Sequence, residues 1–448
     1  MLMTDLIIIG CGPGGYTTAA YAARHGLTVT IFEKGELGGT CLNVGCIPTK
    51  ILCHIGEIFG ESRAVADFEA FTDCSNIDGG ADMCGFKRWK AVVLDQLHAG
   101  LGMLMSSPGI TLVKGEAVFK SAHTVSCDGK DYEARHIIIA TGSRPAKLPI
   151  PMKSFDVKDT DDFFDFDTTK LLDSLTIIGG GVIGMEIASA FSLFGRTPTV
   201  IEYLKECLPS MDQDLAKRLR KILEKRGVTF HLQSAATAII NKTVLFEHKG
   251  ENQTVESDLI LMATGRTPNT NGLGLDTVGI DYDRHGIKTD DNLMTSVPDI
   301  YAIGDVNGRQ MLAHAAEMQG RQVVDHLLGI KRHYRPDLVP SAVFTYPELA
   351  AVGPTEQQLK AEGRKYKVYK SSFRSNGRAV LMCTTEGLVK LIADDNDRLI
   401  ACHVLGNHAA DIVQEATALI QMGATVEDLR TIVHIHPTVN EVLLDAVE

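Results

Sequence analysis

The sequence predicts an α/β fold in which one strand–turn–helix unit occurs twice. Apolar runs at 6–10 (LIIIG) and 175–179 (LTIIG) are typical of buried strands, and each ends in a glycine-rich turn. Stretches rich in small and apolar residues follow both turns and favour helices. Each unit later contains another apolar strand that ends in ATG, at 136–142 and at 259–265. Because the whole pattern repeats in the same order, it indicates a duplicated domain.

The glycine spacing in the first copy is the one that a dinucleotide pyrophosphate requires. Gly10 allows a tight turn, Gly12 lets the backbone approach the phosphates, and Gly15 permits close packing of the helix on the strand. The helix N-terminus then offers amide donors to the anion. Glu33 follows Gly10 by 23 positions and ends the next predicted strand, where a carboxylate can accept hydrogen bonds from ribose hydroxyls. The first copy is therefore predicted to bind a dinucleotide.

The second copy repeats this spacing and also predicts which nucleotide it binds. Gly179, Gly181 and Gly184 follow its strand, and Glu202 again lies 23 positions after the first glycine. A 2′-phosphate about 4 Å from this carboxylate would cost on the order of 4 kcal/mol at an effective dielectric constant of about 20. We therefore expect the second copy to bind NAD rather than NADP.

The first copy is longer than the second, and the added length contains two closely spaced cysteines. From its first to its last glycine the first copy spans 132 positions and the second 86, a difference of 46. Cys41 and Cys46 lie in this added length, within GGTCLNVGCIPTK at 38–50, and their thiols can meet across one turn. A disulfide that closes so short a loop stabilises a fold little, so its expected use is to open and close. A redox disulfide beside one of two dinucleotides suggests a flavin that passes electrons between a nicotinamide and sulfur.

Composition limits the partners of the chain. The 448 residues carry a formal net charge of −12 and no block of lysines and arginines, so we expect neither nucleic acid nor a membrane as a partner. No run of about 18 apolar residues could span a bilayer, and residues 1–6 lack the basic start of a secretion signal. Ten cysteines are too dilute for a disulfide framework, and no CxxC pair suggests a metal site. We expect no metal, a reducing, cytoplasmic compartment, and ordinary thiols at the cysteines other than Cys41 and Cys46.

Five motifs together resemble the class I flavoprotein disulfide reductases. They are GGTCLNVGCIPTK, GGGVIGMEIASAF, YAIGD, MLAHAAEMQG and HIHPTVNE, and with the first strand they extend from residue 6 to residue 441. The segment that contains Leu312 and His314 is most similar to the members of this family that oxidise dihydrolipoamide. It departs from the usual pattern at Ala315 and Gln319, where the family more often has Lys and Glu.

The resemblance implies an α/β fold of two Rossmann-like dinucleotide-binding domains, for FAD and NAD, plus a C-terminal α+β interface domain. On this chain we expect the FAD domain at 1–148 and the NAD domain at 149–266. A central segment at 267–336 should complete the FAD domain, and the interface or dimerisation domain should occupy 337–448.

The resemblance also implies the roles of the site residues. Cys41 corresponds to the thiol that exchanges with the substrate and Cys46 to the thiol that faces the flavin; the family, and not the spacing, gives this order. His436 corresponds to the base and Glu441 to the carboxylate that orients it, whereas we expect His434 only to support His436. The residues expected to bind FAD or NAD are Gly10, Gly12, Gly15, Glu33, Lys50, Thr141, Gly142, Asp305, Met311, Leu312, Ala313, Gly179, Gly181, Gly184, Glu186, Glu202 and Gly265.

The expected activity follows from these roles. The enzyme would reoxidise protein-bound dihydrolipoamide and pass the electrons through the dithiol and FAD to NAD. Lys50 and Glu186 correspond to an ion pair beside the flavin, where an ammonium group favours the reduced, anionic flavin. The resemblance further implies a homodimer with a shared site and, as partner, the lipoyl-bearing protein of a 2-oxo acid dehydrogenase or glycine-cleavage complex. The alternatives are a glutathione-type disulfide reductase and a catalytically silent flavoprotein scaffold of a multienzyme complex.

Overall fold

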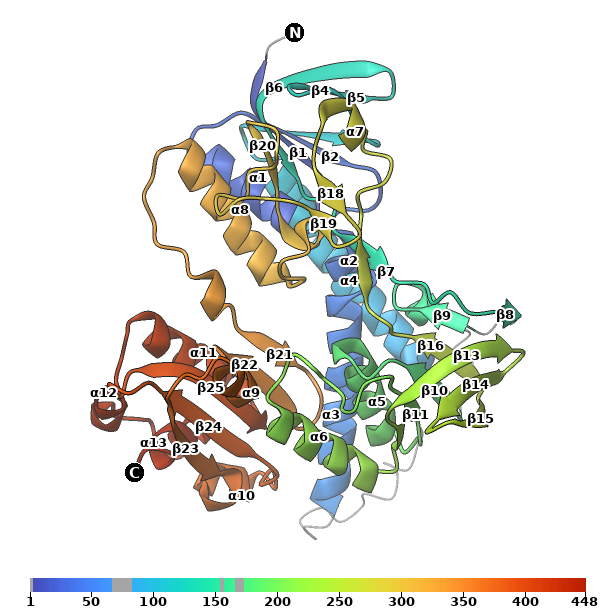
Figure 1. Ribbon diagram of the computed structural model, residues 1–448, viewed down its shortest axis with the longest axis vertical. Coiled ribbons are helices and arrows are strands. Elements are labelled where there is room, and N and C mark those ends of the chain that lie inside the picture. The colour runs from blue at the N-terminus through green and yellow to red at the C-terminus, as the bar shows by residue number, and fades with distance from the viewer. Residues whose placement is uncertain (1–2, 67–82, 154–156, 166–172) are drawn as a thin grey trace.

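The computed structural model describes residues 3–66, 83–153, 157–165 and 173–448 (Figure 1). The first α/β unit lies at the top of Figure 1, the second at the lower right and a C-terminal domain of different build at the lower left. Cys74, one of the cysteines predicted to be ordinary thiols, lies outside the described residues.

A mostly parallel sheet forms the centre of the first unit. In spatial order its strands are β3 (Ile110–Lys114), β2 (Val29–Glu33), β1 (Thr4–Ile9), β6 (Lys130–Ile139), β5 (Thr124–Cys127) and β4 (Val118–Ser121), with β20 (Ile300–Ala302) beside β6. Ile8 of β1 pairs with Ile31 and Ile138, and all three side chains are fully buried. Such apolar runs are typical of parallel strands, which are covered on both faces. Because β20 pairs with β6, the chain near residue 300 returns to complete this sheet.

Two helices that are distant in sequence pack together on the first unit. They are α1 (Pro13–Arg24), directly after the first glycine turn, and α8 (Ala313–Leu327), which lies beside it (Figure 1). Gly320 allows this close approach, because a Cβ atom there would lie within 3.0 Å of the Thr18 side chain. The smaller elements of this unit are β18 (Tyr282–Asp283), β19 (Gly286–Ile287), α7 (Leu275–Val278) and the 3-10 turn η2 (Gly304–Asn307).

The second unit repeats the parallel sheet. Its strands, in spatial order, are β12 (Thr229–His231), β11 (Thr199–Ile201), β10 (Leu175–Ile178), β16 (Leu259–Met262) and β9 (Val157–Asp159). Its helices are α5 (Val182–Leu193) and α6 (Gln213–Lys225). Beside it lies a small sheet of β15 (Glu251–Glu256), β14 (Thr243–His248), β13 (Ser234–Ile240) and β8 (Met152–Lys153). The two-stranded ladder of β7 (Ser143–Pro145) and β17 (Arg266–Pro268) lies where the chain passes between the two units.

The added length of the first copy is helical. It comprises α2 (Gly39–Asn43), α3 (Cys46–Ala66) and α4 (Met83–Met105). α3 extends from the first unit to the second, where it lies beside α5 (Figure 1). Ile51 and Leu52 of α3 share a buried cluster with Ile187 and Phe191 of α5. Cys46 is therefore the first residue of a helix that is anchored in both units, and Cys41 lies in the short helix α2 just before it.

The C-terminal domain is built on an antiparallel sheet. Its strands, in spatial order, are β21 (Ser341–Val343), β22 (Glu348–Val352), β25 (Leu399–Gly406), β24 (Leu388–Ala393) and β23 (Lys367–Ser372). Its helices are α9 (Glu356–Ala361), α10 (Gly377–Leu381), α11 (Ala409–Gln421), α12 (Val426–Thr431) and α13 (Val442–Asp445). Ile412 and Val413 of α11 are buried against Val404 of β25, which gives this domain a core of its own. Among the helices of the described residues, none is both long enough and apolar enough to cross a membrane.

Candidate active site

The first glycine turn has room for a dinucleotide where the sequence predicts it. Gly10 has φ +105°, and a Cβ there would lie 2.5 Å from the carbonyl oxygen of Ala140. A Cβ on Gly15 would lie 1.9 Å from the Gly10 oxygen, so neither position tolerates a side chain. A Cβ on Gly12 would meet nothing within 4 Å, and Gly12 is the N-cap of α1. This open space at a helix N-terminus suits the pyrophosphate of a dinucleotide.

The second glycine turn has the same geometry. Gly179 has φ +110°, and a Cβ there would lie 2.3 Å from the Ala263 oxygen. A Cβ on Gly184 would lie 2.1 Å from the Gly179 oxygen, whereas one on Gly181 would meet nothing within 4 Å. Gly181 is the N-cap of α5, so this turn is open to an anion in the same way as the first.

The two carboxylates predicted to meet a ribose, Glu33 and Glu202, each accept hydrogen bonds from two backbone amides. Glu33 accepts from the amides of Cys11 (2.8 Å) and Gly35 (2.7 Å). Glu202 accepts from the amides of Gly180 (2.6 Å) and Leu204 (2.6 Å). Each carboxylate is thereby fixed beside its glycine turn, and a carboxylate oxygen has lone-pair sites beyond the one that an amide uses. Both units therefore fit an adenosine ribose.

The ends of the two ATG segments are also open. A Cβ on Gly142 (φ +69°) or on Gly265 (φ +107°) would meet nothing within 4 Å. Thr141 is held in place because its hydroxyl donates to the carbonyl oxygen of Asn269 at 2.8 Å, while the Asn269 side chain donates to the Thr141 carbonyl at 3.0 Å. The predicted cofactor residues at 141, 142 and 265 thus lie at the exits of parallel strands, where α/β sheets bind ligands.

The segment that contains the two cysteines packs against the first glycine turn. The amide of Gly38 donates to the Cys11 carbonyl at 2.9 Å, and a Cβ on Gly39 would lie 3.0 Å from the Gly12 Cα. Gly38 and Gly39 both have positive φ (94° and 58°), which explains the two glycines before α2. The dithiol is therefore fixed beside the predicted FAD site.

The two thiols share one hydrogen bond and differ in acidity. The hydrogen bond from the Cys41 thiol lowers the pKa of Cys46, burial opposes this shift, and the Lys50 ammonium adds to it. The same hydrogen bond, together with burial, raises the pKa of Cys41. Cys46 is also the first residue of the long helix α3, a position that favours an anion. These shifts favour Cys46 over Cys41 as the more acidic thiol of the reduced pair.

Lys50 and Glu186 form the expected ion pair. The Lys50 ammonium lies 2.9 and 3.0 Å from the two carboxylate oxygens of Glu186, whose side chain is 1% exposed. The amide of Phe344, from the C-terminal domain, donates to the same carboxylate at 2.9 Å, and the ammonium lies 4.9 Å from the centre of the Phe344 ring. This pair joins α3, α5 and the C-terminal domain one helical turn after Cys46.

Asp305 is held by a chain of polar contacts that the sequence did not reveal. The Ser143 hydroxyl donates to Asp305 at 2.5 Å and accepts from Nε of Arg266 at 2.7 Å. Arg266 also donates to Asp161 at 3.0 Å and to the Thr40 hydroxyl at 3.5 Å. Since Thr40 precedes Cys41, this arginine connects the dithiol segment, the first unit and the second unit.

The start of α8 brings further groups to the site. Leu312 is the N-cap of α8, Ala313 is its first residue, and Met311 precedes them with 38% of its surface exposed. Of the two departures from the family pattern, Ala315 is fully buried, and the Gln319 side chain accepts from the Gly304 amide at 2.8 Å. Gln319 thus holds the turn on which Asp305 lies.

Two ionisable side chains near the dithiol, Glu317 and Tyr16, were missed by the sequence analysis. Burial raises the pKa of Glu317 in α8, and the charge of this carboxylate helps to raise the pKa of Cys41. Burial, then Glu317, then Cys41 raise the pKa of Tyr16 in α1 to about 12. The only sequence signal for Glu317 was its place in MLAHAAEMQG, one turn after Ala313.

His436 and Glu441 form the predicted base and its orienting partner. Nδ1 of His436 lies 2.9 Å from Glu441, and the other Glu441 oxygen accepts from the Thr438 amide at 2.8 Å. These two hydrogen bonds, the Thr438 one first, lower the pKa of Glu441. The His436 side chain is 79% exposed, so its other ring nitrogen is free to meet a substrate.

A second carboxylate, Glu415 of α11, supports the segment that carries His436. Glu415 lies 3.0 Å from Nε2 of His434 and accepts from the Asn440 side chain at 2.6 Å. His434 is only 6% exposed and does not face the solvent beside His436. Glu415 therefore contacts one residue before His436 and one after it, and His434 has a supporting position.

The base does not meet the dithiol of its own chain. The segment between α12 and α13, which contains His436, lies in the C-terminal domain, apart from α2 and the upper end of α3, which contain Cys41 and Cys46 (Figure 1). The flanking side chains of Val433 and Ile435 are 94% and 80% exposed. Apolar side chains this exposed indicate a surface that another molecule covers.

Two dinucleotide-binding units, with a dithiol packed against the glycine turn of the first, define a nucleotide-dependent oxidoreductase that acts on sulfur. Within the described part of the chain, no group of three or more His, Cys, Asp or Glu side chains is arranged to hold a metal ion. The chain belongs to the pyridine nucleotide-disulphide oxidoreductase family, which matches residues 4–320, and residues 339–447 match the dimerisation domain of that family. Its cofactors are FAD and NAD.

Known proteins resemble the chain over its whole length. It is 37% identical to the dihydrolipoyl dehydrogenase of Bacillus subtilis (strain 168), covering 99% of this chain and 96% of that protein. It is 36% identical to the mitochondrial dihydrolipoyl dehydrogenase of Pisum sativum, covering 99% of this chain and 90% of that protein. Among solved structures, the HOCl-induced flavoprotein disulfide reductase RclA from Escherichia coli has a TM-score of 0.87 and 28% identity, covering 99% of both chains. These matches agree with the predicted fold class and family.

Proposed function

We propose that this protein is a dihydrolipoyl dehydrogenase, which oxidises protein-bound dihydrolipoamide to lipoamide and reduces NAD⁺. The observation that carries the proposal is the packing of the dithiol segment on the first glycine turn, through Gly38 and Gly39. The chemistry that a bound FAD supplies is the transfer of the electron pair from the dithiol to NAD⁺ as a hydride. The full-length similarity to dihydrolipoyl dehydrogenases supports dihydrolipoamide as the substrate.

The sulfur chemistry runs through the side chains described above. A substrate thiolate attacks Cys41 of the disulfide, and Cys46 leaves as the thiolate, which Lys50 and the start of α3 stabilise. The second substrate sulfur then closes the lipoamide ring and releases Cys41. Each turnover moves one electron pair from two substrate thiols to NAD⁺ and releases one proton. The lowered pKa of Cys46 fits the thiol that must hold the negative charge.

A base is needed because a free thiol is only a few per cent ionised near neutral pH. We assign this role to the partner subunit's His436, because within one chain the segment between α12 and α13 lies apart from α2 and the start of α3, which contain the dithiol (Figure 1). Glu441 holds Nδ1 of that histidine, which leaves Nε2 to take the substrate proton. The enzyme is on this proposal an obligate homodimer with each site shared between subunits.

The remaining parts of the proposal concern organisation and surroundings. We propose that the chain has three domains. The FAD domain comprises residues 1–148 and is completed by 267–336, the NAD domain comprises 149–266, and the interface domain comprises 337–448. The electrons come from the lipoyl-bearing protein of a 2-oxo acid dehydrogenase or glycine-cleavage complex. The dithiol has to be opened and closed repeatedly, which suits a reducing compartment such as the cytoplasm.

The test is a spectrum followed by two assays. The purified protein should show flavin absorbance, and dihydrolipoamide should produce a long-wavelength thiolate-to-flavin band and then NADH when NAD⁺ is added. Glutathione disulfide with NADPH is the matched control and should give negligible turnover. Reduction of glutathione disulfide at a rate comparable with dihydrolipoamide oxidation would contradict the proposal. A flavin that NADH cannot bleach would point to a silent scaffold instead.

A further inference from the structure

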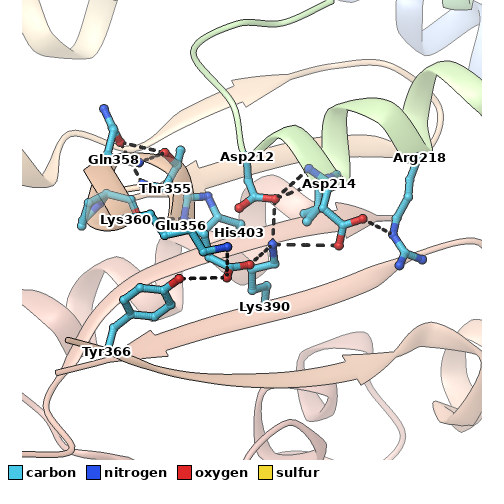
Figure 2. A network of polar contacts seen from close by, with 12 residues as sticks. Asp212, Asp214, Arg218, Thr355, Glu356, Gln358, Lys360, Tyr366, Lys390 and His403 are labelled. Atoms are coloured by element: carbon cyan, nitrogen blue, oxygen red, sulfur yellow. Dashed lines mark hydrogen bonds and ion pairs between the residues drawn. The ribbon is translucent and has the colours of Figure 1, made fainter. Parts of the chain in front are cut away.

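A fully buried lysine connects the C-terminal domain to the NAD-binding unit. Lys390 lies in β24 and is 0% exposed. Its ammonium donates to Asp212 at 2.8 Å and to Glu356 at 2.7 Å, and it lies 3.9 Å from Asp214 (Figure 2). A buried charge is stable only when it is paired and hydrogen-bonded, so this lysine and its carboxylates depend on one another.

The pair crosses a domain boundary. Lys390 and Glu356 belong to the C-terminal domain, from β24 and α9, whereas Asp212 precedes α6 of the second α/β unit (Figure 2). His403 of β25 lies in the same network, and its Nε2 is 3.1 Å from the Pro354 oxygen. Burial raises the pKa of Glu356, but Lys390, followed by Lys360 and Tyr366, lowers this pKa to about 2. Lys390 and Asp212 are the buried members of this cluster, with side chains 1% and 0% exposed.

Asp212 is the residue through which Lys390 can reach the nucleotide. Its side chain caps α6 by accepting from the amides of Asp214 (3.1 Å) and Leu215 (3.4 Å). Residues 203–211 connect the ribose carboxylate Glu202 to Asp212, the N-cap of α6, and we call them the NAD loop. One carboxylate therefore sets both the start of the helix and the end of the NAD loop.

The NAD loop folds back onto the second glycine turn. The amide of Leu208 donates to the Gly180 oxygen at 2.9 Å, and the Leu204 amide donates to Glu202 at 2.6 Å. The sulfur of Cys207 packs so closely on Gly180 that a Cβ there would lie 2.5 Å from it. A displacement of the NAD loop would consequently move the turn and the carboxylate that the adenosine half of NAD is expected to meet.

A second contact from the C-terminal domain lies next to the first. The hydroxyl of Ser341, in β21, donates to the Met211 sulfur at 3.8 Å, and Met211 is 2% exposed. Two consecutive residues, Met211 and Asp212, are thus held by the C-terminal domain at the point where the NAD loop ends. The opposite end of the loop is held by Glu202 within its own unit.

We propose that Lys390 is a positioning residue for NAD, through which the dimerisation domain fixes the NAD loop in its binding conformation. This inference rests on the assignment of the Glu202 unit to NAD. It assigns no contact between Lys390 and the nucleotide; the lysine acts through Asp212. We expect Lys390 to affect how tightly the enzyme binds the adenosine half of NAD. The reduction of the flavin by dihydrolipoamide should not depend on Lys390.

The test measures binding of ADP-ribose to the FAD-loaded protein by titration calorimetry. Lys390→Met should raise the dissociation constant about tenfold, a size typical of coupling between distant groups. Flavin reduction by dihydrolipoamide, followed by stopped flow without NAD⁺, should change by less than about twofold. Lys360→Met is the matched control, since Lys360 also faces Glu356, at 3.5 Å, but is 66% exposed; it should leave both values unchanged.

A further variant decides the matter if Lys390→Met does not fold. Asp212→Asn retains an oxygen to cap α6 but loses the charge that Lys390 holds, and it should raise the dissociation constant several-fold, about threefold or more. An unchanged dissociation constant in a folded variant, even with a lower melting temperature, would overturn the positioning role. Wild-type protein that fails to bind ADP-ribose would instead overturn the assignment of this unit to NAD, and the inference with it.

Discussion

Lys50→Met tests whether the ion pair behind the dithiol sets the acidity of Cys46. Lys50 and Cys46 are one helical turn apart in α3, a spacing that places Cβ atoms about 5–6 Å apart, and we take about 6 Å for the separation of their charges. At an effective dielectric constant of about 20, this separation gives about 2.8 kcal/mol, or about 2 pKa units. Glu186, 2.9 Å from Lys50, acts in the opposite direction, so a net rise of about one unit is expected.

The assay is a pH titration of the thiolate-to-flavin band in the two-electron-reduced enzyme. The pKa of Cys46 is lowered in the folded protein, so the thiolate is present above this pKa and is lost as the pH falls through it. Removing the ammonium should therefore move the midpoint to higher pH. Lys34→Met, which removes an exposed ammonium paired with Glu116, is the control and should leave the midpoint unchanged.

Removing Lys50 also leaves a buried carboxylate unpaired, which costs about 3–5 kcal/mol of stability. If the single variant is too unstable to titrate, Lys50→Met combined with Glu186→Gln removes both charges. The double variant should recover most of the melting temperature. A midpoint in Lys50→Met that stays at the wild-type value, or moves to lower pH, would refute the claim that the Lys50 ammonium lowers the pKa of Cys46.

Three further outcomes are expected. Cys41→Ser and Cys46→Ser should each abolish NADH formation from dihydrolipoamide while retaining flavin absorbance, and turnover in either would exclude the dithiol route. Glu202→Ala should raise the NADPH-to-NADH ratio of kcat/KM at least about tenfold, because it removes a like charge from the 2′-phosphate; an unchanged ratio would show that Glu202 does not select NAD. Glu415→Gln should lower kcat about tenfold and shift its pH profile through misplacement of His436, with KM for NAD⁺ unaffected; loss of stability alone would show that Glu415 has no part in the site.

Local patterns in the sequence were sufficient to predict the two α/β units and the dithiol. The glycine motifs, the acids 23 positions later and the ATG strands lie within short stretches, and each has one main physical explanation. The structure confirms the fold class, with Gly12 and Gly181 open to a ligand at matching helix N-termini. The family resemblance gave Glu441 as the partner of His436, and the structure places the two side chains 2.9 Å apart.

Contacts between distant segments could not be predicted in this way. Arg266 and Ser143 are 123 positions apart, and Lys390 and Asp212 are 178 apart. No periodicity or motif spacing records such pairs, since they arise only when the units pack against one another. Glu415 was missed for the same reason: it lies 19 positions before His434, in a helix whose buried residues form the core, and its own side chain is only 29% exposed.

The most direct test of the account uses two inactive subunits. Cys46→Ser chains retain the base, and His436→Gln chains retain the dithiol, so neither homodimer should oxidise dihydrolipoamide. If each site is built from the dithiol of one subunit and the base of the other, random reassembly of equal amounts restores one intact site in every mixed dimer. About a quarter of wild-type activity should then return. No recovery, in mixtures shown to contain mixed dimers, would contradict a site shared between the dithiol of one chain and the histidine of another.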